Sequence, residues 1–260
     1  MSKNKNPLVS IILPTYNRAA TLGWALQSIA EQTYRNFETI LIDNNCTDNT
    51  LEVAKEYQSS TNLKILSCEI QGCAPACNVG IYHSKGSLIA RQDDDDYWYP
   101  TKLEKQVKFL EKNPSISILG TQVRIIDDNK RPIFDYEIRT DSLSGRFTPP
   151  KKKPTEDHVI KKEFLMGKCP IINPSVVIKK EKLLYVGGYD HIFTRNEDLL
   201  LWLRLIPWCN FANLDEILMD YTSRPNNDNP HVPFVAADMH YQLYKALGIV
   251  SGERPPLNYK

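Results

Sequence analysis

The stretch Val9-Ser10-Ile11-Ile12-Leu13-Pro14 decides the fold, because it has the composition of a short buried strand closed by a proline. Apolar residues at helical spacing follow it, at Leu22, Ala25, Leu26 and Ile29. The alternation repeats, and we expect further strands at 37–42, 63–66 and 88–92 and further helices at 49–57 and 75–82. Strands that alternate with helices predict an α/β domain with a largely parallel sheet.

The second half of the chain is less regular. We expect a strand at 175–178, a leucine-rich buried helix at 198–206 and a terminal helix at 234–247, and we expect Trp202 in the core. A polar, turn-rich segment at 224–233 separates the last two of these elements.

Composition excludes several classes of protein. The 260 residues carry a formal net charge of +1, which gives no electrostatic reason to expect a nucleic-acid partner. No apolar run approaches the length needed to cross a bilayer, and the polar N-terminus lacks a signal sequence. The six cysteines show no paired framework, so we expect reduced thiols and a cytoplasmic protein.

Four consecutive carboxylates, Asp93-Asp94-Asp95-Asp96, follow the apolar run Leu88-Ile89-Ala90. Like charges about 4 Å apart repel by about 4 kcal/mol at the effective dielectric of a protein surface. At the end of a buried strand such a cluster calls for a counter-charge, and Mg²⁺ or Mn²⁺ takes oxygen ligands of this kind. The alternative is a solvated acidic turn.

Polar segments follow three of the predicted strands: residues 14–18, the turn that begins at Asp43, and the aspartate run. In open α/β sheets, ligands bind beyond the carboxyl ends of the strands, so the three segments are expected to line one crevice. The chain has neither a GxGxxG motif nor a Walker lysine loop. A metal held by aspartates can neutralise a diphosphate in a protein that lacks these two phosphate-binding motifs.

Five motifs, in order over about residues 8–205, resemble those of the family 2 glycosyltransferases, which have the GT-A fold. Residues 9–18 are similar to the family's opening strand, and Asp43-Asn44-Asn45-Cys46-Thr47-Asp48-Asn49-Thr50 resembles its Asp-Asp-Gly-Ser-Thr-Asp-Gly-Thr turn. Ala76-Cys77-Asn78-Val79-Gly80-Ile81 resembles its Ala-Arg-Asn-x-Gly-Ile helix. Asp93–Asp96 stands at its Asp-x-Asp-Asp motif, and Gly187-Gly188-Tyr189-Asp190 with Glu197-Asp198 looks like its Gly-Gly-Phe-Asp and Glu-Asp elements.

The resemblance implies an inverting, metal-dependent transferase that uses a nucleotide-diphospho-sugar, most simply a UDP-sugar, with Mn²⁺ or Mg²⁺. It implies a Rossmann-like, mostly parallel mixed sheet flanked by helices, with a C-terminal helical extension. We expect a GT-A domain over 1–225, with a nucleotide-binding half at 7–100 and an acceptor half at 101–225, and the extension over 226–260.

The resemblance also assigns roles to residues. Asp95 is the expected metal ligand and Asp93 a second contact to metal or ribose, whereas Asp94, at the variable position, is expected to be solvated beside the nucleotide. Further nucleotide contacts are expected from Pro14, Thr15, Tyr16, Arg18, Asp43 and Asn78. The alternatives are that Asp43 forms the turn, that Tyr16 is a packing residue and that Arg18 caps a helix.

Asp198 is the expected catalytic base, with Glu197 beside it. A carboxylate base within hydrogen-bond reach activates a poorly nucleophilic acceptor hydroxyl. The alternative for Asp198 is an acid at a helix start that the macrodipole stabilises.

Three positions depart from the family pattern. Cys77 replaces the family's arginine, which removes a candidate phosphate contact, and Asn44 replaces an aspartate of the turn, which weakens the case for base recognition. Arg91 and Gln92 replace apolar residues, so the strand end ahead of the aspartates is expected to be wetter than usual.

The resemblance implies a saccharide or lipid-linked saccharide acceptor in the assembly of surface polysaccharide or glycoconjugate. Any membrane contact is expected to be peripheral, at the inner face. Two rival functions remain open at this point: a sugar nucleotidyltransferase, and a nucleotide- or carbohydrate-binding module without turnover. The sequence does not define the oligomeric state.

Overall fold

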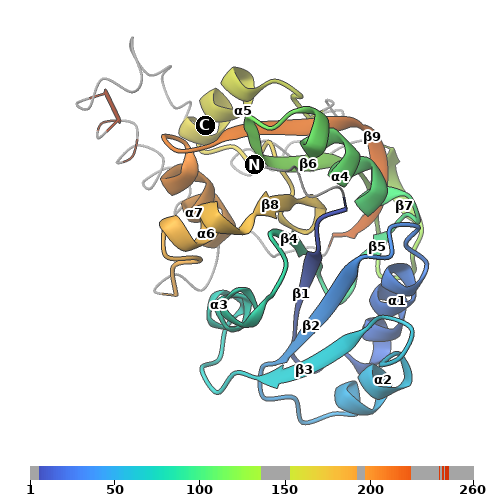
Figure 1. Cartoon of the computed structure of the whole chain (residues 1–260). Coiled ribbons are helices and arrows are strands. Elements are labelled where there is room, and N and C mark those ends of the chain that lie inside the picture. Colours follow the sequence, from blue (N-terminus) through green and yellow to red (C-terminus); the bar gives the residue numbers. More distant parts are fainter. Residues whose placement is uncertain are drawn as a thin grey trace.

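A computed structural model of the chain describes residues 6–135, 153–191 and 197–223, together with residues 240, 242, 244 and 245. In these residues one mixed sheet of nine strands has the order β3-β2-β1-β4-β8-β6-β9-β5, with β7 beside β6. Figure 1 shows α1 and α2 on one side of the first strands and α3 on the other. The predicted C-terminal extension lies outside the described residues, apart from the four single residues.

The parallel half of the sheet forms as the sequence predicts. Strands β1 (Val9–Thr15), β2 (Phe37–Asp43), β3 (Leu63–Ser67) and β4 (Leu88–Arg91) pair in parallel. Helices α1 (Ala19–Ala30), α2 (Thr50–Glu56) and α3 (Cys73–His83) connect them. The parallel α/β arrangement predicted from the alternating pattern is therefore confirmed for this half of the domain.

Strand β1 continues through Pro14 instead of ending there, with Pro14 opposite Ile42 and Thr15 opposite Asp43. Proline lacks the N–H group that a central strand needs. It is tolerated because β4 pairs with β1 only as far as Ile12, so no strand lies against Pro14 on that side. This extra length carries Thr15 to the level of Asp43, the last residue of β2.

The second half adds a mixed layer to the sheet. Strand β8 (Val177–Lys179) runs antiparallel to both β4 and β6 (Ile116–Ile126), and β9 (Asn210–Thr222) runs parallel to β6. The short strands β5 (Tyr97–Trp98) and β7 (Pro132–Asp135) pair with β9 and β6. The other elements are α4 (Lys102–Lys112), α5 (Asp157–Leu165), a 3₁₀ turn at Asn173–Ser175, α6 (Lys180–Tyr185) and α7 (Glu197–Leu205).

Strands β6 and β9 were not predicted. The sequence of β6, ISILGTQVRII, mixes apolar and polar residues without a regular alternation, although nearly all of its side chains are buried, so periodicity does not identify it as a strand. Strand β9 carries polar residues at Asp215 and Glu216, beside a shift in its register with β6 between Thr121 and Gln122. That irregularity interrupts the alternation by which a strand is recognised.

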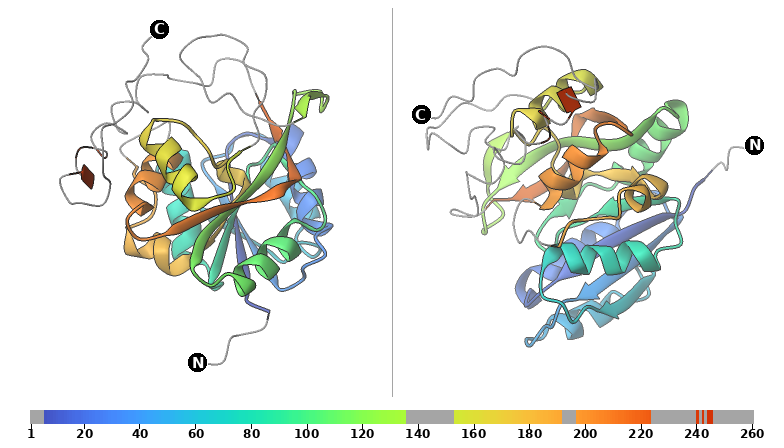
Figure 2. Two further views of the ribbon diagram at one scale, coloured as in Figure 1. Left: turned by 90° about the horizontal axis from the view of Figure 1, so that it is seen from above. Right: turned by 90° about the vertical axis from the view of Figure 1, so that its left-hand side faces the viewer.

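The core lies on both faces of the sheet (Figure 2). On one face Ile11 and Leu13 pack in a cluster with residues of α1 and α4, such as Leu26 and Leu103. On the other face Ile12, Ile40 and Ile42 pack with α3, α5 and α7, including Phe164 and Trp202. Trp202 is fully buried, as predicted. No helix in the described part of the chain is long and apolar enough to cross a membrane.

Candidate active site

Two of the polar segments predicted to meet do so at the carboxyl ends of β1 and β2, and the third follows β4 beside them. Thr15 pairs with Asp43 in the sheet, and the backbone N–H of Asn44 donates to the carbonyl of Thr15 at 3.0 Å. The guanidinium of Arg18, which precedes α1, lies 3.3 Å from the carboxylate of Asp94, which follows β4. The three segments therefore border one site.

Arg91 lies beneath the aspartate run. Its side chain is buried, and its Nη2 donates to Oδ1 of Asp93 at 2.6 Å and contacts Sγ of Cys73 at 3.4 Å. Its Nη1 also donates to the carbonyl of Gln92. Gln92 is itself fully buried and donates to the carbonyl of Asp96 at 3.0 Å. The expectation of a wet strand end is therefore wrong: both polar side chains lie inside and brace the acidic turn.

The four aspartates have different surroundings. Asp94 was expected to be solvated, but its side chain is only 13% exposed, beside Arg18. Burial, followed by the charge of Asp95, raises the pKa of Asp94 to about 7. Asp96 is fully buried; its Oδ1 accepts from the N–H of Thr222 at 2.8 Å, and its Oδ2 has no hydrogen-bond partner among the described residues. A polar group left unpaired in the interior marks a place where a ligand or ion can bind.

Burial, followed by the charges of Asp93 and Asp95, also raises the pKa of Asp96 well above its usual range. The guanidinium groups of Arg91 and Arg18 therefore do not balance the four acids of this turn. Their oxygens suit Mg²⁺ or Mn²⁺ in chemical type. However, the described residues contain no group of three or more His, Cys, Asp or Glu side chains placed to hold an ion alone. Mg²⁺ commonly takes one or two carboxylates together with substrate phosphates, and this donor set fits that arrangement.

Glu197 and Asp198 open α7, about a hundred positions along the chain from the aspartate run. Burial is the main reason that the pKa of Asp198 is raised, and the charge of Asp93 adds to it, while the N–H of Leu199, at 2.8 Å, opposes it. Burial, then the neighbours Cys73 and Asp198, raises the pKa of Glu197 to about 9. The fold therefore brings the predicted base close enough to the aspartate run for the two to interact electrostatically.

Other predicted residues make contacts within the protein. Oδ1 of Asp43 accepts from the N–H of Cys46 at 2.8 Å, so Asp43 does form the turn, as the alternative for this residue held. A contact from Asp43 to a nucleotide base stays a prediction. Tyr16 is 49% exposed at the rim, whereas Thr15 and Pro14 are buried. At this edge the exposed ring of Tyr16 is therefore accessible to a nucleotide.

Asn44 and Asn78 hold loops in place. The amide nitrogen of Asn44 donates to the carbonyls of Cys68 and Ile70 at 3.0 and 2.8 Å, and its oxygen accepts from the N–H of Gly72 at 2.8 Å. An aspartate there has no N–H to offer the two carbonyls. Asn78 likewise uses its amide nitrogen and oxygen on the backbone of Tyr189, both at 2.8 Å. A nucleotide contact by Asn78 would have to share these atoms.

Two tyrosines near the acids were missed by the sequence analysis as site residues. Burial raises the pKa of Tyr221 on β9, and the acids Asp96, Asp93 and Asp198 add to that shift. Burial also raises the pKa of Tyr189, whose hydroxyl donates to Asn173 at 2.9 Å. Tyr189 stands in the Gly-Gly-Tyr-Asp motif, but no local signal marks Tyr221, because β9 itself was not recognised.

Comparison with known proteins agrees with this geometry. The family model "Glycosyl transferase family 2" matches residues 10–173. The putative glycosyltransferase EpsE of Bacillus subtilis is 32% identical over 207 residues, covering 77% of this chain and 67% of EpsE. The Escherichia coli UDP-Glc:alpha-D-GlcNAc-diphosphoundecaprenol beta-1,3-glucosyltransferase WfgD is 32% identical over 209 residues, covering 80% of this chain and 73% of WfgD.

Solved structures show the same fold. A fragment of S. aureus TarS in complex with UDP-GlcNAc superposes with a TM-score of 0.67 at 20% identity, covering 93% of this chain and 65% of that one. The mannosyltransferase PcManGT of Pyrobaculum calidifontis, in complex with GDP-Man and Mn²⁺, gives 0.59 at 20% identity, covering 98% of this chain and 67% of that one. The mixed α/β sheet flanked by helices matches these neighbours, and the predicted fold class is confirmed. The chain is a glycosyltransferase and belongs to glycosyl transferase family 2.

Proposed function

We propose that this chain transfers a sugar, with inversion, from a UDP-sugar to a saccharide acceptor in the assembly of a cell-surface polysaccharide, with the help of Mn²⁺ or Mg²⁺. One observation carries the proposal: the carboxylate at the start of α7 interacts with the aspartate run after β4, although the two are far apart in the sequence. A base and a diphosphate-binding turn on either side of one site are what a direct displacement requires.

The acid at the start of α7 and the aspartate run after β4 serve different parts of the reaction. Asp198 accepts the proton of the acceptor hydroxyl as its oxygen attacks the anomeric carbon, and the bond to the diphosphate breaks on the opposite face. A divalent cation held by Asp95 and Asp93 together with diphosphate oxygens would offset the charge of the leaving group. Arg91 keeps Asp93 in place from below, and Arg18 neutralises Asp94 at the rim.

The donor and acceptor classes rest on the relatives and on chemistry. The name of WfgD states a UDP-glucose donor and a diphosphoundecaprenol-linked acceptor, and TarS was solved with UDP-GlcNAc. The Asp43 carboxylate, which is partly exposed, can accept the imino N–H of uracil. A lipid-linked saccharide is accordingly the acceptor class that we propose.

Asp198→Asn tests the catalytic part of this proposal. We measure transfer or donor hydrolysis with UDP-sugars and Mn²⁺, and UDP binding by calorimetry in parallel. The variant should lose at least about a hundredfold in kcat, the lower range for a general base, while its affinity for UDP stays within about threefold of wild type.

The matched control is Glu52→Gln, which removes one exposed carboxylate on α2 and should leave both measurements unchanged. Equal turnover in wild type and Asp198→Asn would exclude Asp198 as the base. UDP binding without turnover in the wild type, over a panel of UDP-sugars and acceptors, would favour a binding module instead.

A further inference from the structure

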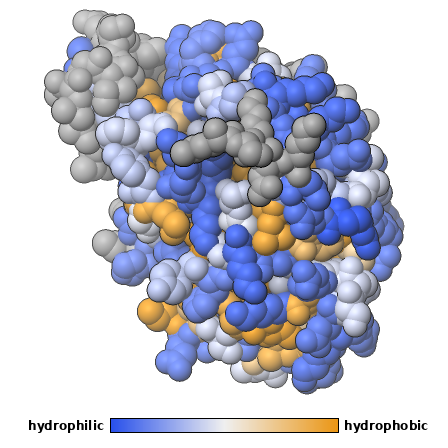
Figure 3. Space-filling model, viewed as in Figure 1, coloured by the Kyte–Doolittle hydropathy of each residue, from blue (hydrophilic) through white to orange (hydrophobic). Residues whose placement is uncertain are grey.

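Three large apolar side chains are exposed together on the side of the molecule formed by α6 and the turn after α7. Leu184 is 53% exposed, Tyr185 64% and Trp208 52%. The rings of Tyr185 and Trp208 pack edge to face, with centroids 5.1 Å apart, so the two elements present one continuous surface. Figures 1 and 2 both show α6 and α7 side by side at the surface, and Figure 3 shows apolar residues in separate patches on a mainly polar face.

Lysines surround these side chains. Lys179, Lys180 and Lys182 lie within four residues of sequence, with Glu181 as the one acid among them. The ammonium groups of Lys179 and Lys180 donate to the carbonyls of Pro114 and Ser84, both at 2.5 Å. In the described part of the chain none of the three lysines forms an ion pair with a carboxylate.

The lysines and the aromatic pair belong to one surface. Burial raises the pKa of the thiol of Cys209, the residue after Trp208, to about 11, and the charges of Lys182, Lys161 and Lys179 oppose that shift. Lys161 is paired with Asp157 at 3.0 Å, and Lys179, Lys180 and Lys182 outnumber the one acid among them, Glu181. We call this surface the α6 face and define it as Leu184, Tyr185, Trp208, Lys179, Lys180 and Lys182.

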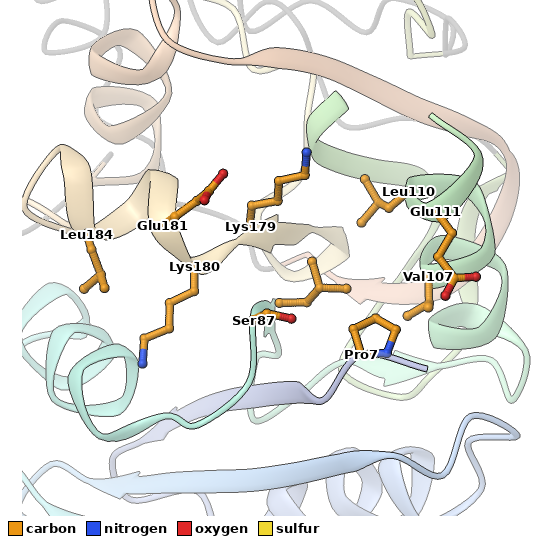
Figure 4. A pocket seen from close by; sticks show the side chains of 10 residues that line it. Pro7, Ser87, Val107, Leu110, Glu111, Lys179, Lys180, Glu181 and Leu184 are labelled. Carbon is orange, nitrogen blue, oxygen red and sulfur yellow. The ribbon is translucent and has the colours of Figure 1, made fainter. Parts of the chain in front are cut away.

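A hollow extends the α6 face towards α4 (Figure 4). Its volume is about 560 Å³, and Val107, Leu110 and Leu184 contribute apolar walls. Two lysines and two acids also line it: Lys179, Lys180, Glu111 and Glu181. Ser87 and Leu88, at the amino end of β4, belong to the same lining, so the hollow is distinct from the candidate active site at the carboxyl end of that strand.

We propose that the α6 face docks this protein on the surface of an anionic lipid bilayer. Tryptophan and tyrosine are enriched at the level of lipid headgroups, because their rings are apolar with one polar edge. Clustered lysines near such anchors are attracted to anionic lipid. A second copy of the chain is a poorer occupant, because a two-fold contact would bring the three lysines of one copy against those of the other.

The position of the α6 face relative to the active site suits this role. Helix α7 begins at the predicted base and leads to Trp208, ten positions after Asp198. At 1.5 Å per helical residue, the part of α7 from Asp198 to its end at Leu205 is roughly 10 Å long, and Trp208 lies in the turn that follows. The inference goes beyond the proposed function, because it requires neither the donor nor the acceptor.

Vesicle binding of the purified full chain tests the proposal. We compare vesicles of phosphatidylcholine alone with vesicles of equal parts phosphatidylcholine and phosphatidylglycerol, without nucleotide, by co-sedimentation at low and high salt. We expect at least about tenfold stronger partition into the anionic vesicles at low salt, and a loss of that preference at high salt.

Tryptophan emission gives a second readout. Trp98 and Trp202 are fully buried and Trp24 is partly buried on α1, whereas Trp208 is half exposed on the α6 face, so anionic vesicles should shift the emission of the wild type to shorter wavelength. Trp208→Phe should abolish the shift.

Variants separate the two parts of the α6 face. The double variant Tyr185→Ser, Trp208→Ser should weaken binding at least about tenfold, and Lys182→Gln alone should weaken it about fivefold. Controls on other surfaces are Lys55→Gln on α2 and Ile133→Ser on β7, both exposed, which should bind like the wild type. Circular dichroism verifies that each variant is folded.

Four results would overturn the proposal. They are no binding to anionic vesicles, equal binding to both vesicle types, unchanged binding of the double variant, and a concentration-dependent dimer that the double variant abolishes without any vesicle binding. Because no nucleotide or acceptor is present, none of these results bears on the proposed transferase activity.

Discussion

Arg91 shows how a single residue organises the acidic turn. It replaces an apolar residue of the family pattern, yet its guanidinium is buried and donates to Asp93 at 2.6 Å. It also reaches towards α3, where Cys73 and Cys77 are small and their sulfurs lie 3.9 Å apart. The two positions that depart from the family pattern, 77 and 91, are therefore neighbours in the structure. Position 77 on α3 has a short cysteine side chain, and position 91 on β4 has a long cationic one.

We expect Arg91→Met to destabilise the protein by roughly 2 kcal/mol or more, because it removes one partner of a largely buried ion pair and leaves Asp93 among like charges. Chemical denaturation measures the change in free energy of unfolding. The control Arg35→Met removes a guanidinium that bonds only backbone carbonyls at the surface and should cost less than about 1 kcal/mol. Equal effects of the two variants would contradict this view of Arg91.

At the scale of elements, α3 connects the two halves of the site. Its first residue, Cys73, contacts Arg91, and Asn78 in its middle holds the backbone of Tyr189 in the loop after α6. It can do so because it lies very close to the sheet. A Cβ atom on Gly80 would be 2.7 Å from side-chain carbons of both Ile12 and Ile42, which is closer than van der Waals contact allows.

Gly80→Ala should therefore destabilise the protein by about 1–3 kcal/mol, the usual cost of overpacking a core. It should also weaken UDP binding, because α3 moves away from the sheet and carries Cys73 and Asn78 with it. Gly23→Ala in α1 is the matched control. A Cβ atom there meets nothing closer than 3.7 Å, so the variant should gain about 0.5–1 kcal/mol from helix propensity.

Thermal or chemical unfolding of both variants checks the pair of predictions. A Gly80→Ala protein as stable as the wild type would show that α3 can shift without loss, and that its closeness to β1 and β2 is not needed.

At the scale of the whole molecule, the site forms between a parallel half and a mixed half of one sheet. The first half supplies the turns after β1, β2 and β4, and the second half supplies α7 and Tyr221 of β9. Neither half alone holds both the predicted metal ligands and the predicted base. Ligands that bind the site should therefore stabilise the complete fold.

We expect Mn²⁺ and UDP to stabilise the protein cooperatively. The described acids form no three-ligand cage, so Mn²⁺ alone should raise the melting temperature by no more than about 1 °C, whereas Mn²⁺ with UDP should raise it by several degrees. Thermal shift over a grid of both ligands measures the coupling. Asp95→Asn should remove the contribution of the metal and keep that of UDP. A large shift with Mn²⁺ alone would indicate a preformed metal site instead.

Local sequence was sufficient for β1 to β4, α1 to α3 and α7, because each pattern there has one clear period and a turn at its end. It also placed the acidic turn and the base on separate elements. What the sequence could not predict was the environment of each acid. These environments depend on neighbours far away along the chain. They decide that Arg18 covers Asp94, that Arg91 points inward, and that Asn44 bonds to backbone groups.

The succession of parallel strands and helices along the chain, and the edge of the sheet at which the chemistry is expected, were determined by the sequence alone, because hydrophobic patterns and turn residues act over a few positions. The pairing of β6 with β9, and the electrostatic interaction of Asp93 with Asp198, were decided only by the tertiary structure. These interactions join segments about a hundred residues apart. Their free energy comes from burial and from charges that the completed fold brings together, and no local pattern encodes it.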